Sequence, residues 1–190
     1  MGVMKYFSFV LVVVMVLSVT HAQASKKKNW CSETVPYKMG MEKMTKLHFY
    51  FHDNITGDYP TTFKIAEAPG VSNTSSTFFG ELYMADDPLT VGPDPNSRLV
   101  GRAQGFFGFS AQKDLSLIMG ISIVFTGNKK LNGSTISIFT RNPIANTDRE
   151  FSIVGGTGYF KLARGFVTAK TYWASGKNAI VEYTCNIVHY

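Results

Sequence analysis

The stretch KLHFYFHDN, residues 46–54, combines aromatic residues with two histidines and ends beside a carboxylate. Alternate side chains of an extended chain share a face. Leu47, Phe49, Phe51 and Asp53 therefore lie on one face, and the residues between them lie on the other. The pattern predicts a strand whose apolar face ends in an acid. A buried charge is costly unless it is paired and hydrogen-bonded, so Asp53 is a candidate for a special role.

The remaining sequence repeats this kind of segment. Short runs rich in β-branched and aromatic residues alternate with turn residues, and no long run has the period of an amphipathic helix. The spacing predicts about eight or nine strands, which is typical of an all-β barrel or sandwich. The run LSLIMGISIVF, residues 115–125, is apolar on both faces, which favours a closed barrel whose outer face is used for oligomerisation. A barrel of about eight strands can also enclose a small ligand cavity.

The N-terminal residues 1–24 predict a secretory signal peptide. Lys5 precedes an apolar run, and small residues of the kind that a signal peptidase cleaves follow it. A membrane anchor is the alternative, but the run is shorter than the roughly 20 residues that a span needs. Residues 25–45 form a basic extension, which is either a solvated tail or a segment attracted to an anionic matrix. The globular domain is expected at 46–190.

Cysteines and sequons fit a secreted protein. Cys31 and Cys185 flank the expected domain, which predicts one disulfide between them, with two unpaired thiols as the alternative. Three Asn-X-Ser/Thr sequons fall where turns are expected, and they predict N-glycans at Asn54, Asn73 and Asn132.

Several other kinds of site find no support in the sequence. His48 and His52 are four residues apart, which on a strand is about 13 Å, so they cannot share one metal ion. The glycines of VGGTGYF, residues 154–160, lack the dinucleotide spacing and fit a tight hairpin between two strands. There is no nucleophile elbow of a serine hydrolase. We predict no metal, no cofactor and no nucleic-acid partner.

Two opposite charges interrupt apolar strand faces. Arg149 shares a face with Phe151 and Ile153, much as Asp53 does with its aromatic neighbours. The two charges could form a buried salt bridge that only specifies the barrel. Alternatively, they could form the polar end of an aromatic pocket that donates or accepts a proton. Spacing alone does not choose between these interpretations.

Four motifs resemble those of the dirigent family of land plants. They are HFYFHD (48–53), DDPLT (86–90), VGRAQGF (100–106) and REFSIVGGTGYFKLARG (149–165). The resemblance implies an all-β, eight-stranded antiparallel β-barrel of the allene-oxide-cyclase/dirigent type, secreted to the apoplast as a homotrimer or homodimer. Family members do not oxidise their substrates. They orient phenoxy radicals, which a laccase or peroxidase makes from phenolic precursors such as monolignols, so that one stereochemistry of coupling results.

The resemblance also implies the roles of individual residues. Asp53 matches the pocket aspartate of the family and Arg149 the pocket arginine, while Tyr159 replaces the aspartate of the usual GGTGDF motif. These three are the predicted catalytic residues. The predicted substrate-binding residues are Phe49, Phe51, Phe107, Phe109 and Asn142.

Departures from the family pattern affect the predicted function. Asn142 stands where pinoresinol-forming members have a second aspartate, and Phe107 and Phe109 stand where those members tend to have tyrosines. The motifs RNP and VEY resemble the branch that includes pterocarpan synthases. We therefore expect a protein that directs phenoxy-radical coupling in lignan-type biosynthesis. The alternatives are a cofactor-free lyase that dehydrates and cyclises an isoflavanol, and a defence or cell-wall protein whose pocket is incidental.

Overall fold

A computed structural model describes residues 35–70 and 75–190 of the chain. The chain divides into two units, Met1–Lys38 and Met39–Tyr190, and the second is the all-β domain. The predicted signal peptide and Cys31 lie outside the described residues, as does Asn73. No helix within 35–70 or 75–190 is long and apolar enough to cross a membrane.

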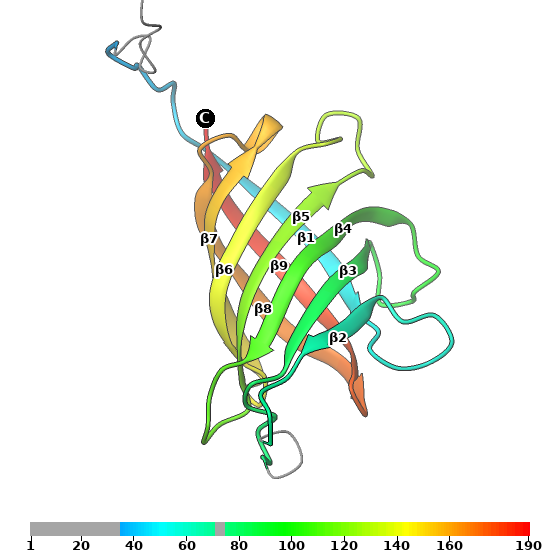
Figure 1. Cartoon of the computed structure of the whole chain (residues 1–190). Helices are drawn as coiled ribbons and strands as arrows, with labels where there is room; N and C mark the ends of the chain where they lie inside the picture. The colour runs from blue at the N-terminus through cyan, green and yellow to red at the C-terminus, as the bar shows by residue number, and fades with distance from the viewer. Residues whose placement is uncertain (1–34, 71–74) are drawn as a thin grey trace, which may run out of the picture. The chain divides into compact units, whose positions relative to one another are not determined.

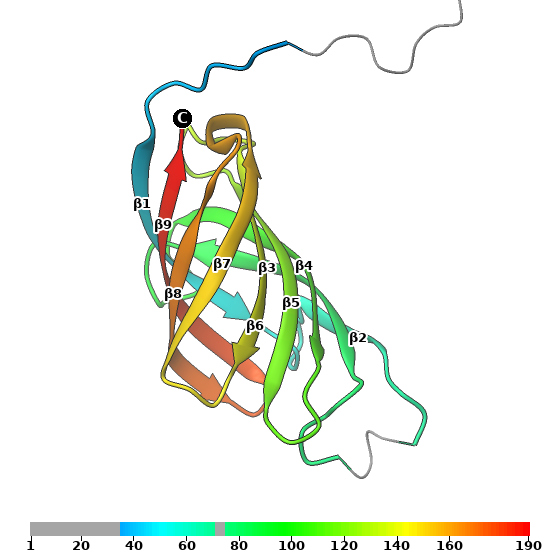
Figure 2. The same ribbon diagram turned by 90° about the vertical axis from the view of Figure 1, so that its left-hand side faces the viewer.

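The domain consists of strands that form one continuous sheet (Figure 1). In chain order the elements are β1 (Lys43–Asp53), β2 (Thr62–Ala66), β3 (Leu82–Thr90), β4 (Leu99–Phe109), β5 (Ser116–Phe125), β6 (Thr135–Pro143), β7 (Asp148–Thr157), the 3₁₀ helix η1 (Gly158–Phe160), β8 (Arg164–Ser175) and β9 (Asn178–His189). The order across the sheet is β1-β9-β8-β7-β6-β5-β4-β3-β2, and all pairs are antiparallel. An additional pairing of β1 with β3 closes eight of these strands into a barrel, which confirms the predicted fold. Figure 2 shows how steeply the strands cross one another around the barrel.

The barrel closes at a short seam between β1 and β3. Only Tyr50↔Thr90 and Phe51↔Leu89 are paired there. Further along β3, the edge is taken over by β2, whose first residue, Thr62, pairs with Ala85. After Phe51, β1 no longer pairs with β3, although it stays paired with β9 as far as Asp53. From there on, β2 is the neighbour of β3.

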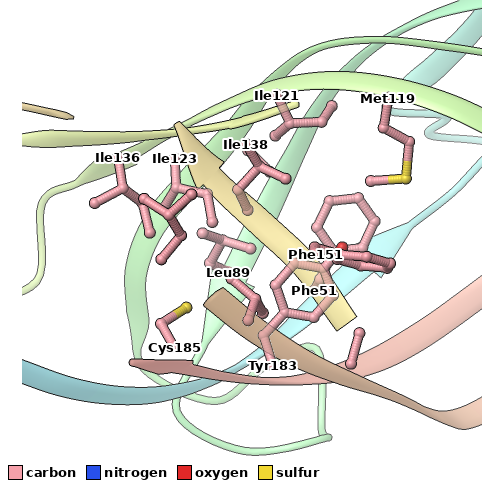
Figure 3. Packing of buried hydrophobic residues seen from close by; sticks show 14 of the residues in the cluster. Phe51, Leu89, Met119, Ile121, Ile123, Ile136, Ile138, Phe151, Tyr183 and Cys185 are labelled. Carbon is pink, nitrogen blue, oxygen red and sulfur yellow. The ribbon is translucent and has the colours of Figure 1, made fainter. Parts of the chain in front are cut away.

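Buried side chains from every barrel strand form the hydrophobic core, and Figure 3 shows part of this cluster from close by. Phe49 and Phe51 are 2% and 6% exposed, so the predicted inward face of β1 is confirmed. The ring of Phe51 stacks on Tyr183 at 5.6 Å between centroids, and Phe151 meets Tyr183 edge-on. The part of the interior that these rings fill therefore has little free volume.

The connection between β7 and β8 differs from the predicted tight hairpin. η1 begins at Gly158, the last residue of the GGTG segment, and the turn has hydrogen bonds from Lys161 N to Gly158 O and from Ala163 N to Phe160 O. Gly158 has φ +60°, and a Cβ there would lie 2.7 Å from Ser134 Oγ. The glycine therefore permits a turn that packs against Ser134, the residue before β6, in place of a two-residue β-hairpin loop.

The predicted disulfide stays a prediction, because its partner Cys31 lies outside the described residues. Within the described residues, Cys185 is a free cysteine on the inner face of β9, and it is completely buried beside Leu89 and Tyr183 (Figure 3). Burial raises the pKa of its thiol. Of the predicted glycan sites, Asn132 is exposed in a turn and Asn54 is half-buried at the end of β1. Glycosylation stays a prediction.

The outer face carries a row of exposed apolar side chains. Met84 on β3 pairs with Phe106 on β4, and Gly120 on β5 lies between Phe106 and Phe139 on β6. Met84, Phe106 and Phe139 are all exposed. Oligomerisation through this outer face stays a prediction.

Leu89→Ala tests the importance of the seam for stability. Leu89 is fully buried opposite Phe51, so truncation should lower the free energy of unfolding by about 2–5 kcal/mol in urea denaturation. Met84→Ala on the exposed face of the same strand is the matched control, with an expected change within about 0.5 kcal/mol. Equal losses for the two variants would contradict this description of the barrel interior.

Candidate functional site

A cavity of about 340 Å³ occupies one end of the barrel interior. It lies where β1 ends and β9 begins, because Asp53 pairs with Ala179 and both line it. The ends of β4, β6 and β8 and the starts of β3, β5, β7 and β9 contribute the other walls. Six of the predicted site residues line this cavity: Phe51, Asp53, Phe107, Phe109, Asn142 and Arg149.

Two predicted site residues do not line the cavity. Phe49 lies deeper in the core, where its ring contacts Phe125 edge-on. Tyr159, in η1, contacts His189 at 4.8 Å between ring centroids. His189 pairs with Lys43 at the start of β1, so the length of that strand places Tyr159 roughly 30 Å from Asp53. The predicted catalytic role of Tyr159 in this cavity is therefore wrong.

Asp53 is half-buried, its Oδ1 atom is fully buried, and it has no ionic partner among the described residues. Its Oδ1 atom has no hydrogen-bond partner, and burial raises the pKa of Asp53 to about 6, an effect that the Thr62 hydroxyl opposes. No ion pair within the described parts of the chain joins Asp53 to Arg149, so the salt-bridge interpretation is wrong. A carboxyl group with a pKa near neutrality suits a general acid.

Arg149 is held by neutral hydrogen bonds instead. Its Nη1 donates to Asn142 Oδ1 at 3.1 Å, and its Nη2 donates to Thr171 Oγ1 at 2.8 Å. The Asn142 amide contacts Met119 Sδ through Nδ2 at 3.0 Å, which fixes the orientation of the amide. Arg149 Nε is buried without a partner, and burial lowers the pKa of the guanidinium group. The arginine thus presents a fixed positive charge to the cavity, apart from Asp53.

Flat aromatic pairs form much of the cavity wall. Tyr83 stacks on Phe107 at 5.1 Å between centroids with 11° between the ring planes, and Phe51 stacks on Tyr183 in the same way. The Tyr83 hydroxyl donates to Glu81 Oε2 and accepts from Lys177 Nζ at 3.2 Å. Such walls suit a planar aromatic ligand, which gains from offset or edge-on contacts with neighbouring rings.

Sequence reasoning missed several residues around the site. Tyr83 and Asp87 share the buried face of β3 with Ala85 and Leu89. The two-residue period of a strand could therefore have identified Tyr83 and Asp87 as inward-facing. Asp87 is fully buried behind the cavity wall, where Thr61 and Thr62 donate to its carboxyl group. Burial and the nearby Asp53 raise the pKa of Asp87 to about 7. Within 35–70 and 75–190, no three His, Cys, Asp or Glu residues are grouped so that they could hold a metal ion.

Comparison with known proteins identifies the family. The family model described as Dirigent-like protein matches residues 44–188. The chain belongs to the dirigent family. It is 50% identical over 159 residues to Dirigent protein 1 of Arabidopsis thaliana, which covers 83% of this chain and 86% of that protein. It is 46% identical over 153 residues to Pterocarpan synthase 1 of Glycyrrhiza echinata, covering 78% and 80% of the two chains.

A solved structure supports the same family assignment. The pterocarpan synthase dirigent protein GePTS1 superimposes with a TM-score of 0.77 at 42% sequence identity, covering 84% of this chain and 99% of that chain. A second pterocarpan synthase dirigent protein, PsPTS1, gives a TM-score of 0.72 at 41% identity and covers 78% and 96%. The resemblance drawn from the sequence motifs is thus confirmed for both family and fold.

Asp53→Asn should stabilise the folded protein at pH 8 but not at pH 3. The folded protein retains the Asp53 proton up to about pH 6, whereas the unfolded chain releases it near the ordinary pKa of 3.8. Stability from this proton is therefore full below pH 3.8 and is lost as the pH rises to about 6. Urea denaturation at pH 8 should show a gain of roughly 1–3 kcal/mol for the variant.

Asp58→Asn is the matched control for this measurement. Asp58 lies exposed in the loop after β1, so its replacement should leave stability unchanged at both pH values. A gain for Asp53→Asn that is the same at pH 3 and pH 8 would contradict a raised pKa for Asp53.

Proposed function

We propose that this dirigent protein binds phenolic radicals or the quinone methides formed from them in its barrel cavity and directs the stereochemistry of bond formation. The observation that carries the proposal is the placement of an unpaired, half-buried acid, Asp53, in an aromatic cavity that also contains Arg149. A separate laccase or peroxidase would generate the radicals. The protein would act in the extracellular space of the plant, as the predicted signal peptide suggests.

Orientation would be the main contribution of the cavity. Stacked pairs such as Tyr83 with Phe107 and Phe51 with Tyr183 restrict a planar ring to a few positions. Holding two reactive groups in one geometry removes much of the entropic cost of their reaction. A chiral cavity that permits one geometry thereby favours one enantiomer of the product.

Proton transfer would be the second contribution. When an internal hydroxyl group adds to a quinone methide, the quinone oxygen must gain a proton and the attacking hydroxyl must lose one. Asp53 can supply the first proton in its neutral form and accept the second in its ionised form, because its pKa is about 6. Arg149 Nε, which has no partner among the described residues, would donate a hydrogen bond to a substrate oxygen.

A cofactor-free isoflavanol dehydratase is the second candidate function. Asp53 is the only acid among the described residues that line the cavity, and position 142 supplies an amide rather than a second carboxyl group. One acid suffices for dehydration. Asp53 would protonate the leaving hydroxyl, water would depart to give a protonated quinone methide, and a phenol would close the ring and return its proton to Asp53. The likeness to pterocarpan synthases supports this second function.

One assay with two arms separates these functions. With coniferyl alcohol and a laccase, chiral chromatography should show an enantiomeric excess that depends on this protein. With an isoflavanol and no oxidase, consumption of substrate would instead support the dehydratase. In the arm that responds, Asp53→Asn should reduce the effect by roughly 10²-fold, because a general acid contributes about that much, whereas Asp58→Asn should not. Full activity of Asp53→Asn would contradict the role of this acid, and no response in either arm would favour an incidental pocket.

A further inference from the structure

Three strands bring two carboxyl groups together at the barrel seam. The pairing Phe51↔Leu89 is antiparallel, so two residues further on Asp53 lies level with Asp87 on the same inward face. β1 leaves the edge of β3 there, and Thr62 begins β2 beside both acids. The closure of the barrel therefore fixes this arrangement.

Thr62 links the two acids. Its Oγ1 lies 3.2 Å from each carboxyl oxygen of Asp87, and the same hydroxyl interacts with the carboxyl group of Asp53. Thr61 also donates to Asp87 Oδ1. A hydroxyl group has one proton to give and lone pairs that accept, so it can donate to one carboxylate while accepting from a protonated one.

The surroundings disfavour two negative charges in this place. Asp87 and Thr62 are 0% and 1% exposed, which excludes water from the link. The cation that acts on Asp87 is Arg102 of β4, which is itself paired with Asp86 on the outside. The tyrosines Tyr83 and Tyr183 also face the pair, and burial raises the pKa of both. His52, next in sequence to Asp53, has its pKa lowered by burial.

We propose that Asp53 and Asp87 share one proton through the Thr62 hydroxyl, and that Asp87 is the positioning residue that keeps Asp53 able to donate at neutral pH. The second part rests on the proposed function of Asp53. When the shared proton resides on Asp87, the Thr62 hydroxyl passes its own proton to the Asp53 carboxylate and takes the proton of Asp87. Asp53 then holds the proton that it donates while the negative charge resides on Asp87, and the proton that the product returns restores the pair.

The pKa directions agree with this geometry. Burial raises the pKa of Asp53 to about 6, and burial together with the charge of Asp53 raises that of Asp87 to about 7. Two interacting acids release their protons in two steps that belong to the pair. Between these steps one proton remains, and it can reside on either carboxyl group.

Carbon-13 NMR of the aspartate carboxyl groups tests the sharing without any substrate. In the full chain, the Asp53 signal, assigned by its loss in Asp53→Asn, should show two inflections with pH. In Asp87→Asn it should show one, and in Asp53→Asn the Asp87 signal should titrate roughly one pH unit lower, because the like charge is gone. Asp86→Asn, which removes the neighbouring outward-facing acid, should retain both inflections. A single inflection in the wild type, or an Asp87 signal unchanged by Asp53→Asn, would overturn the proposal.

The pH profile of activity tests the positioning role. In the assay arm that responds, Asp87→Asn should move the alkaline limb down by roughly one pH unit, whereas a purely structural residue would lower activity without moving the limb. Thr62→Ser keeps the hydroxyl group and should leave the alkaline limb of the pH profile unmoved. Thr62→Val removes the hydroxyl group and should move the limb. An unmoved limb in Asp87→Asn would overturn the positioning role. Failure of both assay arms would refute the proposed function instead and leave the NMR result as the test of proton sharing.

Discussion

The seam between β1 and β3 is the constraint on which the rest of the structure depends. Two residue pairs, Tyr50↔Thr90 and Phe51↔Leu89, convert an open sheet into a closed barrel. Closure creates an inside, and the alternation of side chains then directs every second residue into it. Because β1 ends directly after the seam, its last residue, Asp53, lies at the boundary between the filled and the hollow part of the interior.

The chemistry of the site follows from that boundary. Aromatic residues remove Asp53 from water, and the absence of an ion pair to Arg149 leaves its charge uncompensated, so its pKa rises. Arg149 is satisfied separately by Asn142 and Thr171. A buried acid without an ionic partner lowers the stability of the fold, and residues that lower stability in this way are expected at functional positions. Asn142 supplies no carboxyl group, so Asp53 is the single acid among the described residues that line the cavity.

Local patterns predicted an all-β barrel or sandwich and the inward faces of Asp53 and Arg149, and the family motifs predicted the eight-stranded barrel and the other cavity residues. Contacts between distant segments were beyond both. Alternation placed Phe51 and Asp53 on the inner face of β1 correctly, and it could have placed Asp87 as well. It could not show that Tyr159 lies at the far end of the barrel, because that depends on the register of β9 against β1. The cysteine spacing suggested a disulfide, and it could not show that parity on β9 turns Cys185 inward, into the core. Sequence periodicity fixes a face, and only the pairing of strands fixes a neighbour.

A crystal structure of the protein with a racemic cyclised phenolic product, such as a furofuran lignan or a pterocarpan, tests the central claim most directly. The cavity should select one enantiomer from the mixture. Its rings should stack on the walls formed by Tyr83 and Phe51, with the ether oxygen formed by ring closure within hydrogen-bond distance of the Asp53 carboxyl group. Binding outside the barrel, or equal occupancy of the cavity by both enantiomers, would contradict the claim that this cavity directs stereochemistry.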